Sequence, residues 1–101
     1  MIASFSIVPM GRGESVAGDV ARIIDMIDRS GLDYRMGPMS TTVEGGTDEV
    51  IDLIMSCHRL MRETAARVLT SIEIDDREGA EGRLSGKIAD VEKILGKEIK
   101  K

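Results

Sequence analysis

Two segments of this chain repeat one pattern, in which an alternating strand runs through glycines into a helix. The first segment reads SIVPMGRGESVAGDV and the second reads STTVEGGTDEV. Residues 2–9 alternate with period two, which is typical of a strand with one buried face, and we expect Pro9 to end it. A short strand before a bend at Gly37-Pro38, a third strand over residues 40–44 and a fourth over residues 67–75 follow from the same reasoning.

Helical periodicity predicts three helices between and after these strands. Their apolar stripes are Val16, Val20, Ile23, Ile24 and Ile27, then Val50, Ile51, Ile54, Cys57 and Met61, and finally Ile88, Val91 and Leu95. We expect Ser15, Thr47 and Ser85 to cap the three helix N-termini, and Gly31 and Gly96 to end the first and third helices.

The resulting order, βαββαβα, predicts an α+β fold of the ferredoxin-like class. Two βαβ halves with right-handed crossovers form a four-stranded antiparallel sheet in the order 4-1-3-2, with helices on one face. We predict a single domain over residues 1–101, with the βαββαβ sandwich at about 2–76 and an additional C-terminal helix at about 84–96.

Charge and composition exclude several classes of function. The 101 residues include 14 Lys or Arg and 18 Asp or Glu, for a net charge of −4. A mildly acidic chain without a basic run is poorly suited to nucleic acid or to an anionic membrane. Cys57 is the only cysteine, which rules out an internal disulfide, and His58 is the only histidine, so we expect no metal site.

The sequence gives little indication of a membrane-spanning segment or of a signal peptide. No apolar run approaches the roughly 20 residues that span a bilayer. The apolar N-terminus lacks a basic leader, so we interpret it as a strand and not as a signal peptide. We therefore expect a cytoplasmic protein.

The face of the sheet away from the helices is the candidate site. The alternation places short hydroxyls and acids there: Ser4, Ser6, Ser40, Thr42, Glu44, Ser71, Glu73 and Asp75. A shift of register by one residue would expose Phe5, Ile7, Ile72 and Ile74 instead. Such a face is either simply solvated or a site for a ligand with amino groups and a positive charge. Because a single sheet is flat, a second subunit stacked on it would be needed to enclose the ligand.

Four segments, SIVPMGRGES, PMSTTVEGGTDEV, SCHRL and RVLTSIEIDDR, resemble the small thiamine-binding protein family over about residues 2–95. The resemblance implies non-catalytic binding of thiamine, its pyrimidine half or its phosphates, with no cofactor required. It also implies dimers through the sheet faces that pair into tetramers. Ser6, Thr42 and Glu44 match ligand positions of the family, whereas Ser40 replaces a glycine that is common after Pro-Met. That replacement would narrow the pocket or change its selectivity.

From this resemblance we hypothesise that Glu44 is the main partner of the ligand's aminopyrimidine or cation. Ser6, Ser40 and Thr42 would supply hydrogen bonds, and Ser71 and Glu73 are further candidates. A phosphate could instead bind where two glycine-rich turns, one with Arg12, precede helices that we expect at the same end of the sheet.

Two other functions stay open. The polar face could seal subunits together in a purely structural assembly module without a small ligand. Alternatively, Glu44, Glu73 and Asp75 could act as acid and base in a small hydrolase, since MGRGE resembles the arginine loop of acylphosphatases. The chain contains no asparagine to position a water molecule, which disfavours the hydrolase.

Overall fold

The structure, a computed structural model, describes residues 1–11, 13 and 16–101. Its elements, in chain order, are β1 (Ile2–Met10), α1 (Ala17–Arg29), β2 (Asp33–Met36), β3 (Thr41–Glu44), α2 (Thr47–Arg62), β4 (Arg67–Asp75) and α3 (Arg83–Leu95). The predicted order of strands and helices is confirmed. Ser15 and Arg12, the predicted cap and the predicted anion-binding side chain, lie outside the described residues.

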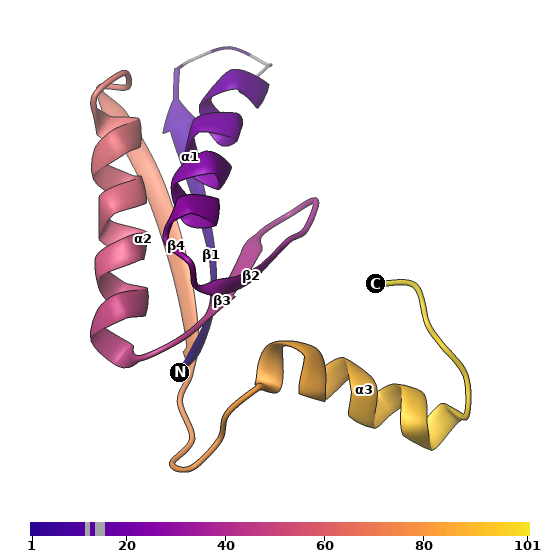
Figure 1. Ribbon diagram of the computed structural model, residues 1–101. Helices are drawn as coiled ribbons and strands as arrows, with labels where there is room; N and C mark the ends of the chain where they lie inside the picture. Colours follow the sequence, from indigo (N-terminus) through magenta and orange to yellow (C-terminus); the bar gives the residue numbers. More distant parts are fainter. Residues whose placement is uncertain (12, 14–15) are drawn as a thin grey trace.

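The four strands form one antiparallel sheet in the order β2-β3-β1-β4, which confirms the predicted topology (Figure 1). β4 pairs with the whole of β1, from Ile2 opposite Asp75 to Met10 opposite Arg67. β3 pairs only with the first part of β1, from Ile2 to Phe5. β1 therefore lies between two strands at its beginning and beside β4 alone at its end.

Pro9 does not end the first strand, contrary to the sequence prediction. It pairs with Val68 inside β1, which continues to Met10. Proline lacks an N–H and is tolerated where a strand edge has no partner to receive one. β3 has already ended at this level of the sheet, so β1 offers such an edge here.

Helices α1 and α2 pack on one face of the sheet and enclose the core (Figure 1). Ile27, Val43, Val50, Ile54 and Cys57 are fully or almost fully buried, and Ala3 and Phe5 contribute from β1. On the strands these residues stand at alternate positions, and on the helices they stand three or four positions apart. The apolar patterns of both kinds of element therefore point to this core. Ile72 and Ile74 lie on the same side, opposite Phe5 and Ala3, but remain 42% and 47% exposed on the edge strand β4.

The two core helices begin at opposite ends of the sheet, which overturns the prediction of a shared anion-binding end. α1 follows the Met10 end of β1, and α2 follows the Glu44 end of β3. Because β1 and β3 run antiparallel, with Ile2 opposite Glu44, these ends are far apart along the strands (Figure 1). The two helix N-termini cannot bind one phosphate together.

Two predicted N-caps are also wrong. α2 begins at Thr47 itself, with Gly46 in the cap position, and α3 begins at Arg83 with Gly82 as its cap. Ser85 is therefore inside the first turn of α3. The glycines at the other ends agree with the prediction, because Gly31 and Gly96 take the positive φ angles expected just after a helix.

α3 lies away from the two core helices and extends outward from the sheet (Figure 1). Its first turns contact β3 and β2, and Leu84 there is buried. Farther along, Val91, Ile94 and Leu95 are 45%, 86% and 53% exposed. The apolar stripe predicted for this helix is thus covered only at its beginning within this chain.

Candidate ligand-binding site

The face of the sheet opposite α1 and α2, called the open face below, carries polar residues in rows across the strands. Directly opposed residues of antiparallel strands point to the same side of a sheet. Ser4 lies between Thr42 and Glu73, and Ser6 lies opposite Ser71. Arg35 extends the Thr42 row on β2. The structure therefore places the strand positions of the predicted site on one face.

The predicted residues differ in exposure across this face. Ser6, Ser40, Thr42 and Glu44 are partly buried, whereas Ser71 and Glu73 on the edge strand are exposed. Ser4 donates a hydrogen bond from its hydroxyl to that of Ser40 at 3.0 Å, which fixes the beginning of β3 against β1. The better enclosed half of the open face is thus the half near β2 and β3.

A cleft of about 620 Å³ lies between this half of the open face and α3. Its lining residues are Arg35, Met36, Gly37, Ser40, Thr42, Ser85, Ile88, Ala89, Glu92 and Lys101. The sheet supplies two hydroxyls, and α3 supplies a wall of small, apolar and acidic side chains. A cleft with apolar walls and a few polar groups is the usual form of a small-molecule site.

A second hollow of about 210 Å³ lies beside the later part of β1, which does not pair with β3. Ser6 and Ser40 line it together with apolar residues of α1 and of the turn between β2 and β3, including Ile23 and Met39. Ser40 lines both the cleft and this hollow. The two spaces therefore share lining residues at the β2–β3 turn, and three predicted residues, Ser6, Ser40 and Thr42, border them.

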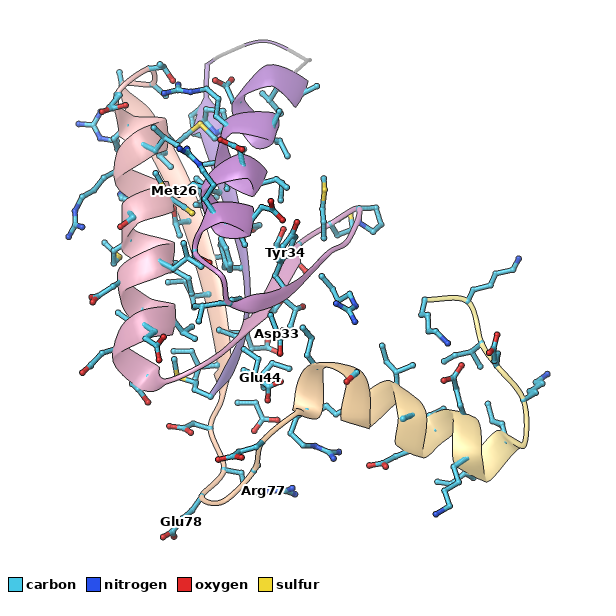
Figure 2. All side chains as sticks on the ribbon, in the orientation of Figure 1. Met26, Asp33, Tyr34, Glu44, Arg77 and Glu78 are labelled. Carbon is cyan, nitrogen blue, oxygen red and sulfur yellow. The ribbon has the colours of Figure 1, made fainter. Side chains whose placement is uncertain are left out.

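Glu44 has a structural role that the sequence did not indicate. Its carboxylate accepts backbone N–H groups of the first turn of α3, from Arg83 at 2.8 Å and from Leu84 at 3.0 Å (Figure 2). Partial burial alone would raise the pKa of Glu44, but these two hydrogen bonds, with the N-terminal ammonium and Arg83, lower it below 4.5. Glu44 thus serves as the N-terminal cap of α3 from a distant strand.

One ion pair links α3 to the sheet, and another lies within the helix. Lys87 contacts Asp75 at the end of β4 at 2.6 Å, and this hydrogen bond lowers the pKa of Asp75. Arg83 pairs with Asp90 at 3.0 Å within the helix. Glu44, Asp75, Arg83 and Lys87 line a small hollow of about 90 Å³ at the beginning of α3. The helix that forms one wall of the cleft is therefore attached to the sheet mainly through Glu44, because the exposed Lys87–Asp75 pair contributes little.

Cys57 and His58 do not form a reactive pair. The thiol of Cys57 is buried, and burial raises its pKa to about 11. His58 Nδ1 lies 2.7 Å from the Thr70 hydroxyl and links α2 to β4. Among the residues that the structure describes, no three His, Cys, Asp or Glu side chains are placed to hold a metal ion. In the same part of the chain, none of the helices is both long and apolar enough to cross a membrane.

Sequence reasoning missed the contribution of α3 to the site. Ser85, Ile88, Ala89 and Glu92 line the cleft, and their spacing of three and four residues defines one face of a helix. That periodicity was visible in the sequence. The position of this face opposite β2 and β3 depends on the bonds to Glu44, which lies about 40 residues earlier and is not indicated by any local pattern.

The chain is similar to proteins of bacteria and archaea over almost its full length. It is 30% identical to the UPF0045 protein MJ1052 of Methanocaldococcus jannaschii over 88 residues, covering 87% of this chain and 88% of that protein. It is 32% identical to the UPF0045 protein MT1949 of Mycobacterium tuberculosis, with 94% of each chain covered.

Solved structures share the fold. The crystal structure of MJ1052 superposes with a TM-score of 0.82 at 29% identity, covering 89% of this chain and 93% of that one. A Thermotoga maritima protein, named provisionally for thiamine biosynthesis or salvage, gives a TM-score of 0.79 at 27% identity, with 89% and 96% covered. The sequence model of the family described as thiamine-binding protein matches residues 3–92. With the fold and the relatives in agreement, the chain belongs to the thiamine-binding protein family.

Proposed function

We propose that this protein binds thiamine or a related aminopyrimidine, without catalysis, in the cleft between the open face and α3. The observation that carries the proposal is the position of Ser40 and Thr42. Both belong to the segment that resembles the family, and both line a cleft of about 620 Å³ in a chain that the family model matches over residues 3–92.

The chemistry of the cleft suits such a ligand. Ring nitrogens and an exocyclic amine need hydrogen-bonding partners, and hydroxyls can both donate and accept. Ile88, Ala89 and Met36 provide apolar surface for a heteroaromatic ring. Ser6 lies in the adjoining hollow, where it would contact a ligand that extends past Ser40.

The remaining predicted residues take secondary roles in this proposal. The carboxylate of Glu44 is engaged by α3, so it would support the cleft by holding its wall in place. Ser71 and Glu73 are exposed near the other edge of the open face, where they would meet a second copy of the chain or a ligand bound between two copies. A dimer or tetramer formed through the open faces would enclose the cleft.

Titration calorimetry with thiamine tests the proposal. The wild type should give saturable heat, and Thr42→Val, which keeps the shape but removes the hydroxyl, should weaken binding about two- to thirteenfold, because one hydrogen bond contributes about 0.5–1.5 kcal/mol. Thr47→Val, at an exposed position at the start of α2, is the matched control and should bind as the wild type does.

Light scattering on the same variants separates binding from assembly. A ligand-binding protein with Thr42→Val should lose affinity and keep its oligomeric state. A structural module should show no thiamine heat, and the same variant should reduce its oligomeric state. A hydrolase would require turnover of a phosphoryl or acyl substrate that Thr42→Val diminishes.

A further inference from the structure

Glu92 brings the negative charge into the cleft. Within the part of the chain that the structure describes, three charged residues line it, and two of them, Arg35 and Lys101, are cationic. Arg35 lies on the sheet side, where it donates a hydrogen bond to the Tyr34 carbonyl at 2.9 Å. Glu92 lies on α3, one helical turn beyond Ile88, and is the one carboxylate among the described lining residues.

The carboxylate of Glu92 already binds a cation from its own chain. Its Oε2 accepts a hydrogen bond from Lys101 Nζ at 2.8 Å and another from the backbone N–H of Ile99 at 2.9 Å. The side chain of Glu92 is only 19% exposed, whereas that of Lys101 is 44% exposed. The hydrogen bond from Lys101 contributes most to lowering the pKa of Glu92, so the carboxylate is ionised at neutral pH.

We propose that Glu92 binds the cationic ring of the ligand and that the Lys101 ammonium occupies this position until the ligand displaces it. The proposal rests on the proposed function, because it names the anionic group of the same cleft. A largely covered carboxylate is costly without a counter-charge, and either cation can supply one. An exposed lysine in an ion pair is held weakly, so a ligand that also fills the cleft can replace it.

The displacement requires movement of one side chain and no unfolding. Ile99 is partly buried, and its backbone N–H binds Glu92 separately from Lys101. The segment after α3 therefore keeps one attachment when the lysine leaves. Thiamine, with its permanently charged thiazolium ring, is suited to this exchange, whereas its pyrimidine half is uncharged at neutral pH and is not.

Calorimetry of full-length variants with thiamine tests the exchange. Lys101→Gln removes the competing cation and should tighten thiamine binding by up to about fivefold, since exposed ion pairs contribute about 0.2–1 kcal/mol. Lys100→Gln removes the same charge at the neighbouring exposed position and should leave the affinity unchanged. Glu92→Gln should weaken binding about fivefold, and adding Lys101→Gln to it should then have no further effect.

The outcomes distinguish this inference from the proposed function. If thiamine binds the wild type, but Lys101→Gln has the same affinity as Lys100→Gln, the exchange is wrong and thiamine binding stands. If Glu92→Gln weakens the uncharged pyrimidine half as much as thiamine, Glu92 does not recognise the cation, and the inference again fails. Absence of thiamine binding in every variant overturns both proposals. The Lys101 comparison remains decisive even if Glu92→Gln fails to fold.

Discussion

At the scale of single residues, Glu44 explains how a carboxylate is accommodated on the sheet. A partly buried acid needs donors, and it finds two in the backbone of α3, at 2.8 and 3.0 Å. The orphan N–H groups at a helix start need an acceptor in turn. Because Gly82 has no side chain to cap α3, the distant glutamate satisfies both needs. One residue thereby attaches the third helix to the sheet.

Replacing this cap should loosen α3 selectively. Glu44→Gln keeps the size of the side chain but puts an NH₂ group where one oxygen accepted a hydrogen bond. We expect the docked state of α3 to lose about 1 kcal/mol, so that its backbone amides exchange hydrogen about fivefold faster, while those of α2 are unchanged. Hydrogen exchange followed by NMR measures this, with Glu73→Gln, an exposed acid of the same face, as control. Equal exchange in α3 of both variants would show that Glu44 is not its cap.

Acid should release α3 before the core unfolds. Glu44 and Asp75, which hold the helix, have pKa values below their usual 4.5 and 3.8, because α3 backbone donors and Lys87 respectively stabilise their charged forms. Their contribution to stability is therefore present above those ordinary values and lost as the pH falls through the lower folded values. Protection factors measured from pH 6 to pH 3 should fall in α3 earlier than in α2. Simultaneous loss in both helices would contradict this.

At the scale of elements, the sequence predicts most of the fold. β4 is observed over residues 67–75, as expected, and α3 over 83–95 instead of 84–96. The alternation works because one side of each strand must face α1 and α2, and a change of register would turn Phe5 outward. The prediction that Pro9 ends the first strand was wrong, because a strand tolerates proline where its neighbouring strand has already ended.

The site was less predictable than the fold, for a physical reason. Alternation assigns Ser6, Ser40 and Thr42 to the open face, but it does not say which of them a helix covers. The wall of the cleft depends on contacts between α3 and residues about 40 positions away. The predicted N-caps were wrong for a similar reason. Thr47 and Ser85 fit local preferences for a helix N-cap, but Gly46 and Gly82 occupy the cap positions. Long-range hydrogen bonds leave no periodic signal in the sequence.

At the scale of the whole molecule, exposed apolar residues lie on the open face, through which we propose that the chain assembles. Val8, Met10 and Leu69 lie beyond the polar rows and are 44%, 40% and 57% exposed, and Val8 and Leu69 are paired across β1 and β4. Adjacent exposed apolar side chains on a sheet favour contact with another protein surface. In the proposed dimer, a second copy would cover them and enclose the neighbouring cleft.

A charge within this patch should prevent assembly. In the proposed symmetric dimer, Leu69→Lys would place one buried ammonium on each side of the interface, so we expect this variant to be monomeric in light scattering and the wild type to be dimeric or tetrameric at the same concentration. Ile72→Lys, on the same strand but on the opposite side and 42% exposed, is the matched control and should keep the assembly. Loss of assembly in Ile72→Lys alone would locate the interface on the other side of β4.

Thiamine, in the function proposed for this protein, binds between the open face and α3. The most direct measurement is an NMR titration of the isotope-labelled protein with thiamine, which reports affinity and location together. We predict saturable shifts at Ser40 and Thr42 on the sheet and at Ser85 and Glu92 on α3, with smaller changes at the buried residues of α2. Saturable shifts confined to other surfaces, or no shifts at millimolar thiamine, would contradict the account.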